Sequence, residues 1–363
     1  MQIQLVDVLN QYKKIKDEIR TAIDEVLESG QYILGKNVFE FENNCSKYLN
    51  IKHAIGVSSG TDALLVSLMA IGIEEDDEVI TTAFTFAATV ETILLLKAKP
   101  IYVDIENDSF NIDFTKIENV ITRKTKAIIP VHLYGQSCEM DEILSIAKKY
   151  NLYVIEDAAQ SFGAEFKNKK TGTFGNIGTT SFFPSKNLGA FGDAGMVFTN
   201  DDKLAEKIRA IIVHGSKERY YHEILGVNAR LDTIQSAILN VKLKYLDMWN
   251  SQRQKFAKNY DELFQNSNII IPITKLYRNH IFHQYTIKVE RRDELTEFLK
   301  SKNVPFGIYY PLPLHKQKAY FCKNNFLPNT EMIANQVISL PMHTELTFEM
   351  QKYIVETILS FYK

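Results

Sequence analysis

The sequence predicts an α/β protein with a large, mostly parallel sheet domain followed by a smaller α/β domain. From His53 to about residue 200, short β-branched runs alternate with helical patterns. The strand signal then fades, and a second α/β region begins near Ile269. Alternating strands and helices imply a mostly parallel sheet with helices on both faces. A chain of 363 residues exceeds what one compact core usually holds, so we expect domains at 1–245 and 246–363.

The chain is expected to begin with helices. In residues 11–29 apolar side chains recur at helical spacing, and Ser29-Gly30 ends the pattern. Residues 38–48 form a second, shorter helical pattern.

Seven strands are expected in the large domain. They lie near residues 54–57, 78–82, 100–104, 126–131, 152–156, 179–183 and 195–199. Helices such as 61–70 and 140–150 connect them. In such sheets, ligands gather at the carboxyl ends of the strands.

The C-terminal third is expected to be more helical. One long helix is predicted over residues 230–264. The second α/β region follows, with strands near 282–289 and 306–310 and helices near 292–302 and 347–361.

The composition argues against several classes of protein. A net charge of −2 removes the main electrostatic argument for binding nucleic acid. Three cysteines, Cys45, Cys138 and Cys322, are odd in number and far apart, so neither a disulfide framework nor a metal site is expected. No secretory signal is recognised, and the apolar run 92–96 is too short to span a bilayer. We therefore expect a cytoplasmic enzyme or binding protein.

The stretch from Gly178 to Gly189 carries the main functional signal. Lys186 follows a strand rich in hydroxyl and aromatic side chains and precedes the glycine-rich run 189–195. Most loop lysines are simply solvated. A lysine at the end of a strand can also form a Schiff base with a carbonyl cofactor such as pyridoxal phosphate (PLP). That chemistry needs a phosphate-binding site, an acid for the pyridinium nitrogen and a ring that stacks on the cofactor.

A candidate phosphate site follows the first strand. In the stretch 58–64, Gly60 lets the backbone approach closely, and the helix N-terminus offers N–H groups to an anion. The hydroxyls of Ser59 and Thr61 add donors. An ordinary helix cap has the same composition, so this stretch is ambiguous by itself.

Candidates for the acid that pairs with the pyridinium nitrogen, and for the ring that stacks on the cofactor, lie at the ends of other strands. Asp157 ends a buried strand, and Gln160 lies nearly one helical turn further on. A carboxylate there can keep the pyridine nitrogen protonated, although paired acids also serve as metal ligands or helix caps. Phe86 is the candidate stacking ring and Phe84 the second choice, since an aromatic residue after a strand usually belongs to the core.

In their order and spacing, these segments resemble the PLP-dependent sugar aminotransferases of the DegT/DnrJ/StrS group, which have fold type I. The matching stretches are Ser59–Leu64, Ala83–Phe86, His132–Gly135, Glu156–Gln160, Ser181–Lys186, Gly226–Arg230 and Tyr309–His315. They extend over nearly the whole chain.

The resemblance implies a role for each matching residue. Lys186 would carry the cofactor and move protons, while Asp157 would pair with the pyridinium nitrogen. The remaining cofactor contacts it implies are Gln160 at the ring oxygen, Phe86 on the ring face, and Gly60, Thr61 and Ser181 at the phosphate. Asn228 would reach the phosphate of a neighbouring subunit's cofactor, so the active sites of a homodimer would be shared. Relatives with histidine in place of this lysine are dehydratases, so Lys186 favours transamination.

Two segments resemble one branch of the family. Residues 214–215, 219–222 and 226–232 make up the first, and residues 246–253 the second; both are similar to enzymes that act on dTDP-linked 3-oxo-6-deoxyhexoses. The resemblance therefore implies glutamate as amino donor and amination at C3, with C4 amination of a UDP- or dTDP-linked sugar as the alternative. A non-catalytic PLP-binding regulator is a second alternative. The candidate substrate contacts are Arg219, Tyr221, His222 and His315, each of which is equally well explained by helix capping or surface solvation.

Overall fold

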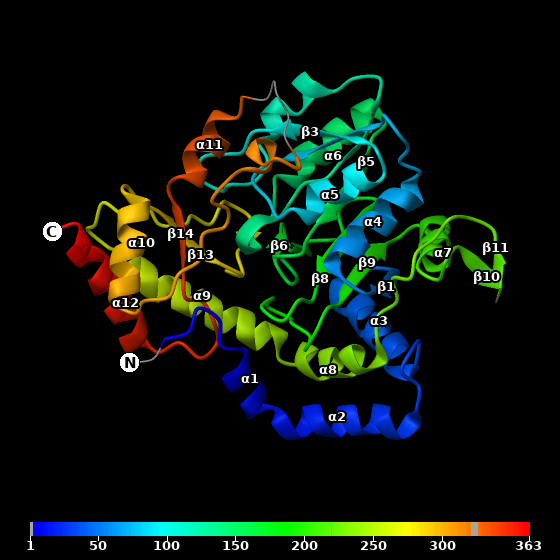
Figure 1. Ribbon diagram of the computed structural model, residues 1–363, viewed down its shortest axis with the longest axis horizontal. Helices are drawn as coiled ribbons and strands as arrows, with labels where there is room; N and C mark the ends of the chain where they lie inside the picture. Colours follow the sequence, from blue (N-terminus) through cyan, green and yellow to red (C-terminus); the bar gives the residue numbers. More distant parts are fainter. Residues whose placement is uncertain (1–2, 219, 321–325) are drawn as a thin grey trace.

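A seven-stranded sheet forms the centre of the protein (Figure 1). The computed structural model describes residues 3–218, 220–320 and 326–363. The spatial order of the strands is β1 (His53–Val57), β9 (Gly195–Thr199), β8 (Ile177–Ser181), β5 (Tyr153–Asp157), β4 (Thr125–Ile128), β2 (Glu78–Thr82) and β3 (Lys99–Val103). Only β9 runs antiparallel to its two neighbours in this sheet. The predicted mostly parallel sheet of seven strands is confirmed.

Helices cover both faces of the sheet because neighbouring side chains along each strand point in opposite directions. On β9, Val197 packs in the cluster that contains α4 (Gly60–Ile71) and α7 (Asp202–Ile211). Its neighbours Met196 and Phe198 pack in the cluster that contains α3 (Lys36–Leu49). The remaining helices of this part are α5 (Ala88–Leu95) and α6 (Met140–Tyr150).

The prediction of one long helix over 230–264 is wrong in one respect, because the structure has two helices there. The first is α8 (Thr233–Leu243) and the second is α9 (Leu246–Leu263). No glycine or proline marks the junction, so the periodic sequence does not show it. The start of α9 still packs with the large sheet, because Leu246 lies in the same cluster as Leu239 of α8, whereas Tyr260 further along α9 packs in the C-terminal core. The proposed domain boundary at 245 and 246 falls at this junction.

The C-terminal region has its own hydrophobic core. There β13 (Tyr285–Lys288) pairs antiparallel with β14 (Val337–Leu340), and α10 (Arg292–Ser301) and α12 (Phe348–Phe361) pack against them. The strand predicted over 306–310 is wrong. In that stretch only Gly307 bridges to the sheet, opposite Ser339, and the second strand is the later apolar run of β14.

The N-terminal segment connects both regions of the molecule. The helix predicted over 11–29 is divided at Ile15 into α1 (Val8–Lys14) and α2 (Lys16–Ser29). Ile19 of α2 packs against Ile238 of α8, while Ile3 lies in the C-terminal core. The smaller elements are β6 (Glu165–Phe166), β7 (Lys169–Lys170), β10 (Ser216–Glu218), β11 (Tyr221–His222), β12 (Arg278–Asn279) and α11 (Pro328–Ala334).

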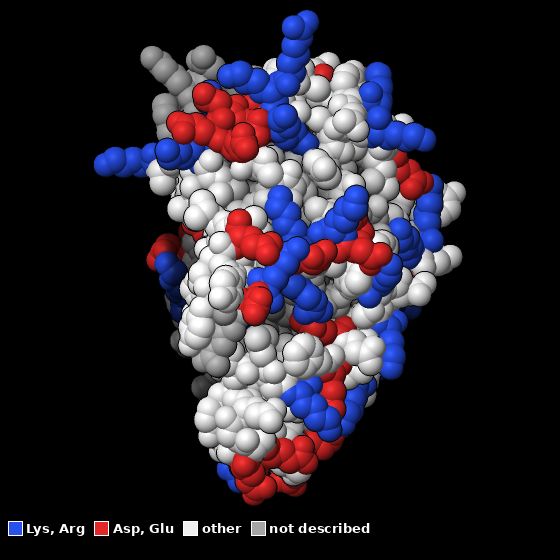
Figure 2. Space-filling model, turned by 90° about the vertical axis from the view of Figure 1, so that its right-hand side faces the viewer, with Lys and Arg blue, Asp and Glu red and all other residues white. Residues whose placement is uncertain are grey.

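The surface carries charges of both signs. On the face seen in Figure 2, basic and acidic side chains lie next to one another rather than in separate patches. Within the described residues, no helix combines the length and the apolar character needed to cross a membrane.

Candidate active site

The carboxyl ends of β5 and β8, together with the N-terminus of α4, bring most of the predicted cofactor residues together. Asp157 is the last residue of β5, and Ser181 is the last residue of β8. Lys186 lies in the turn that follows β8, where its backbone N–H bonds to the carbonyl of Phe183. Ligands of open α/β sheets bind at such an edge.

The carboxylate of Asp157 is buried and held from two sides. Its Oδ2 accepts a hydrogen bond of 2.8 Å from the hydroxyl of Thr89, which lies on α5. Its Oδ1 accepts one of 3.2 Å from the backbone N–H of Ala159. Because both bonds fix the plane of the carboxylate, Asp157 can present it to a cationic ring nitrogen without reorganisation.

The amine of Lys186 is half-buried near this carboxylate. Burial lowers the pKa of Lys186 to about 8, and the negative charge of Asp157 opposes part of that shift. An amine with this pKa is partly unprotonated at neutral pH, as a nucleophile must be. A strongly shifted lysine in a cluster of polar groups is typical of an active site.

The start of α4 approaches the end of β8 more closely than any side chain would allow. A Cβ placed on Gly60 would lie 2.6 Å from the Cβ of Ser181. Ser59 caps the helix by accepting a hydrogen bond from the N–H of Asp62. The N–H groups of Gly60 and Thr61 have no partner within the helix, because they belong to its first turn. Together with the hydroxyls of Thr61 and Ser181, they form a donor set that suits a phosphate.

The two candidate rings have opposite environments. Phe84 is completely buried in the core, which removes it as a stacking ring. Phe86 is 58% exposed, and its ring centre lies 6.4 Å from that of Tyr310. A large aromatic face left open beside polar groups suits stacking on a planar ring.

Gln160 is held at both ends of its amide. Its Oε1 accepts a hydrogen bond of 2.8 Å from the N–H of Tyr134, and its Nε2 donates one of 3.2 Å to the hydroxyl of Tyr310. Burial and the nearby Asp157 raise the pKa of Tyr310, so its hydroxyl stays protonated. Tyr310 thus connects Gln160 with Phe86 through contacts on its two sides.

The carboxylate next to Asp157 faces the opposite side of β5 and serves the fold. Glu156 is completely buried and accepts hydrogen bonds from the backbone N–H groups of Gly172, Phe174 and Gly175. The ring of His132 lies 2.9 Å from it. With every oxygen occupied, Glu156 has no capacity left for a ligand.

Asn228 lies on the surface rather than in this cluster. Its Oδ1 accepts a hydrogen bond of 3.0 Å from the Nε of Arg230. Both residues line a hollow of about 430 Å³, which also contains Ser58, directly before the residues proposed to bind phosphate. Asn228 is therefore accessible to a group from outside its own chain.

The four candidate substrate contacts differ in position. Tyr221 is 68% exposed in the hairpin of β10 and β11, and His222 beside it bonds through Nδ1 to the carbonyl of His214. Figure 1 shows this hairpin at the periphery of the molecule, beyond α7. Arg219 lies outside the described residues. His315 is buried and its Nε2 lies 3.0 Å from Glu331, so surface solvation does not explain it.

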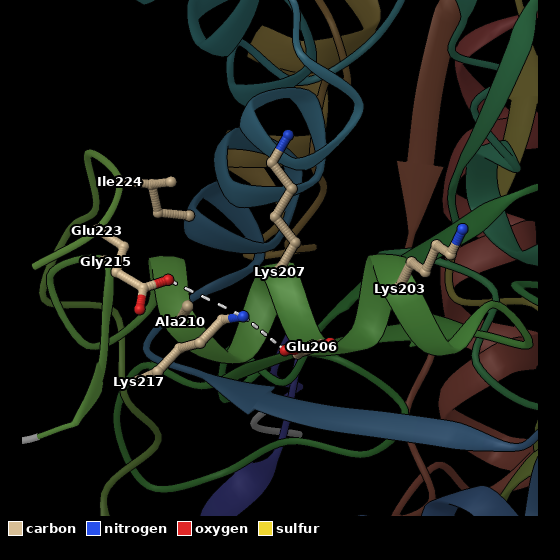
Figure 3. A pocket seen from close by; sticks show the side chains of 8 residues that line it. All are labelled: Lys203, Glu206, Lys207, Ala210, Gly215, Lys217, Glu223 and Ile224. Carbon is tan, nitrogen blue, oxygen red and sulfur yellow. Dashed lines mark ion pairs between the residues drawn. The ribbon is translucent and has the colours of Figure 1, made fainter.

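A second hollow, of about 200 Å³, lies between α7 and the same hairpin (Figure 3). Lys217 forms ion pairs there with Glu206 and Glu223, and Figure 3 shows both pairs. None of the proposed cofactor residues lines it, so it is separate from the Lys186 cluster. Among the residues that the structure describes, no group of His, Cys, Asp and Glu side chains is arranged to hold a metal ion.

Three residues of the cluster were not predicted from the sequence. Thr89 comes from a helix, Tyr310 from a loop and His283 from the segment before β13, and the three lie far apart along the chain. Tyr310 falls within a stretch that matched the family, but Thr89 and His283 have no local signal that distinguishes them from core residues.

The residues present suit PLP. A carboxylate for the ring nitrogen, an amine with a lowered pKa, an exposed aromatic ring and an anion-binding helix start meet at one edge of the sheet. Each is a group that this cofactor needs.

Comparison with known proteins gives relatives over the full length of the chain. The model of the DegT/DnrJ/EryC1/StrS aminotransferase family matches residues 13–359. A pleiotropic regulatory protein of Geobacillus stearothermophilus is 48% identical, with 100% of this chain and 99% of the relative covered. A UDP-2-acetamido-2-deoxy-3-oxo-D-glucuronate aminotransferase of Pseudomonas aeruginosa is 46% identical, with 95% and 96% covered. A dTDP-3-amino-3,6-dideoxy-alpha-D-galactopyranose transaminase of Aneurinibacillus thermoaerophilus is 41% identical, with 98% of each covered.

Solved structures agree with this assignment. Streptomyces venezuelae DesV in complex with a ketimine intermediate superposes with a TM-score of 0.97 at 35% identity, covering 100% of this chain and 99% of that one. NtdA from Bacillus subtilis with bound cofactor PMP has a TM-score of 0.90 at 35% identity, with 98% and 82% covered. The chain therefore belongs to the DegT/DnrJ/EryC1/StrS aminotransferase family and is a PLP-dependent sugar aminotransferase.

Proposed function

We propose that this enzyme transfers the amino group of glutamate to C3 of a nucleotide-linked 3-oxo sugar, with dTDP-3-oxo-6-deoxyhexose as substrate and dTDP-3-amino-3,6-dideoxyhexose as product. The observation that carries the proposal is the half-buried Lys186 amine, with its pKa lowered to about 8, in the same cluster as Asp157. The relatives at 46% and 41% identity are named for chemistry at C3 of their sugars.

The residues of the cluster have distinct proposed tasks. PLP, when bound, supplies an electron sink for the carbanion that forms when a proton leaves the amino-bearing carbon. Asp157 holds the proton on the ring nitrogen, and Phe86 and Gln160 fix the plane of the ring. Lys186 Nζ removes the proton from the α-carbon of glutamate, and in the second half-reaction it delivers one to C3 of the sugar. Gly60, Thr61 and Ser181 bind the phosphate.

The alternative substrates differ in the nucleotide and in the position of the keto group on the sugar ring. The relatives include enzymes whose names state UDP- and dTDP-linked sugars, so both nucleotides enter the test. A C4-keto sugar is the alternative at the ring. Incubation with glutamate and each of four sugars, the 3-oxo and the 4-keto sugar linked to either UDP or dTDP, followed by product analysis, separates them. We expect 2-oxoglutarate release in proportion to the amino sugar formed from the dTDP-linked 3-oxo sugar.

We propose that the active sites are shared in a homodimer. Asn228 is exposed beside Ser58 and would reach the phosphate of the partner subunit's cofactor. Mixing subunits tests this directly. Lys186→Ala and Asn228→Ala variants, each impaired alone, should recover about a quarter of wild-type activity after they are unfolded and refolded together, because half of the dimers are hybrids with one intact site. No recovery would show that each site is built from one chain.

A PLP-binding regulator is the second candidate, because the relative at 48% identity is named a pleiotropic regulatory protein. The two readings differ in what glutamate does. We expect purified protein with PLP to show a visible absorbance band that glutamate converts to that of the pyridoxamine form, while Lys186→Ala shows neither. A stable band that glutamate leaves unchanged would favour the regulator or a different donor.

A further inference from the structure

The turn that carries Lys186 is fastened by the residue that follows it. Asn187 is buried, and its Nδ2 donates hydrogen bonds of 2.7 Å to Asn250 Oδ1 on α9 and 3.2 Å to the carbonyl of Ile281. Its Oδ1 lies 3.2 Å from Nδ1 of His283. One amide therefore joins the turn after β8 to α9 and to the segment before β13.

These contacts determine which atoms carry protons. The carbonyl of Ile281 can only accept a hydrogen bond, so the NH₂ group of Asn187 must face it. The oxygen of Asn187 then faces His283, and Nδ1 of that ring must be the donor. In the neutral ring, Nε2 is consequently unprotonated.

The surroundings keep His283 neutral. Its ring is buried, and the charged groups that act on it are Lys186 and Arg253, both basic. Burial first, and then these two positive charges, lower the pKa of His283 well below its usual range. The ring can therefore hold Asn187 by a neutral hydrogen bond without placing a third positive charge next to the amine.

We propose that His283 is a positioning residue for Lys186, which acts through the Nδ1–H···Oδ1 bond to Asn187 and holds the turn so that the amine stays half-buried near Asp157. This inference rests on the proposed role of Lys186 and adds a residue that no sequence motif pointed to. The far end of the turn is held separately, since Lys242 Nζ on α8 donates to the carbonyl of Gly189. Loss of the bond from His283 leaves Asn187 held only through its Nδ2, so the segment that carries Lys186 loosens while Gly189 stays in place.

Three substitutions of His283 test which nitrogen of its ring is needed. His283→Asn places an amide NH₂ where Nδ1 was, His283→Gln places one near the position of Nε2, and His283→Phe keeps the volume without a donor. His280→Phe is the matched control: that histidine is also buried and precedes the same strand, but its Nδ1 accepts from the N–H of Phe282 and does not contact Asn187.

The first readout needs no cofactor. Trace labelling of Lys186 with acetic anhydride, followed by mass spectrometry across pH, gives the midpoint at which the amine becomes reactive. We expect a midpoint of about 8 in wild type, His283→Asn and His280→Phe. In His283→Phe and His283→Gln the midpoint should rise toward the ordinary lysine value of about 10.4, because the freed amine reaches water.

The second readout is the rate at which the apoprotein captures PLP, followed by absorbance. We expect His283→Phe and His283→Gln to be slowed about tenfold, with His283→Asn close to wild type. The proposal is overturned if His283→Phe matches wild type in both readouts, or if His283→Asn is as defective as His283→Phe. If His280→Phe changed the labelling midpoint and the capture rate as much as His283→Phe does, the proposal would also be overturned, because the effect would then come from general packing. Failure of wild type to capture PLP would instead refute the cofactor role of Lys186, while the labelling midpoints still decide the role of His283.

Discussion

The carboxyl edge of the sheet and the hairpin of β10 and β11 are built in contrasting ways. At the edge, two functional side chains are each held by a group from another element: Asp157 by Thr89, and Gln160 by Tyr310. In the hairpin, Tyr221 is 68% exposed, and the ring of His222 bonds only to a carbonyl of its own loop among the interactions described.

This contrast indicates a division of labour. Asp157 and Gln160 are fixed within one chain before any ligand arrives, which is the preorganisation that proton transfer requires. Tyr221 and His222, the hairpin residues proposed for the sugar nucleotide, are left exposed, so we expect them to become ordered only against a substrate or a second subunit. Substitutions in the two regions should then affect different steps of the reaction.

The largest effect is expected at Lys186. Replacing it by alanine removes the amine proposed to carry PLP and move the proton, so activity should fall by at least about 10³-fold while the fold is retained. Steady-state assays and circular dichroism test this. Mass spectrometry after borohydride reduction should find PLP on Lys186 in wild type, and its attachment to another lysine would contradict the assignment.

The two neighbouring carboxylates of β5 should separate activity from stability. Asp157→Asn removes the charge that holds the ring nitrogen protonated, and we expect activity to fall about 10²-fold or more with little change in stability. Glu156→Gln places an NH₂ group either against the backbone donor of Gly172 or against those of Phe174 and Gly175, and it should cost about 3 kcal/mol of unfolding free energy. Denaturation curves and PLP-saturated assays of both variants test the distinction, which fails if both lose the same property.

Phe86 and Phe84 should likewise separate PLP binding from stability, with a smaller effect on function than the carboxylates have. Phe86→Ala removes an exposed ring, so PLP affinity should weaken about tenfold while stability stays unchanged. Phe84→Ala creates a cavity in the core and should cost about 3–5 kcal/mol. Titration with PLP and thermal unfolding provide the two measurements. A stable Phe84→Ala protein with weak PLP binding would reverse the roles.

Substitutions in the hairpin of β10 and β11 should affect only the reaction with the keto sugar. Tyr221→Ala and His222→Ala should raise the KM for the keto sugar about tenfold, with no change in the single-turnover rate with glutamate alone. Tyr277→Ala, which removes an equally exposed tyrosine elsewhere, is the control and should leave both unchanged. If the glutamate half-reaction slowed instead, the division between the two regions would not hold.

The smallest effect concerns pH and the stability of the apoprotein. The folded-state pKa of Lys186 is about 8 and the unfolded value is about 10.4, so between these values the unfolded chain binds more protons and stability rises with pH. Below pH 8 the full penalty of burying the charge applies. Lys186→Met should therefore raise the melting temperature at pH 7, and its advantage should shrink between pH 8 and 10.4. Lys255→Met, at an exposed lysine of α9, should show no such trend.

The sequence predicted the sheet well because its strands are short apolar runs separated by turns, and each lies within a few residues of its predicted place. The junction between α8 and α9 was missed because the apolar period continues across it: Leu239 before it and Leu246 after it pack in the same cluster. Asp157 and Lys186 were found because their spacing matches known chemistry. His283 and Thr89 were not, since what distinguishes them is a contact across the fold rather than a local pattern.

The buried carboxylate of Glu156 has one more consequence, for hydrogen exchange. Residues 171–176 belong to no helix or strand, and loop amides of that kind usually exchange rapidly with solvent. Gly172, Phe174 and Gly175, however, donate their amide hydrogens to a completely buried side chain. Their release requires that β5 itself open, so we expect these three loop amides to exchange as slowly as those in the centre of the sheet.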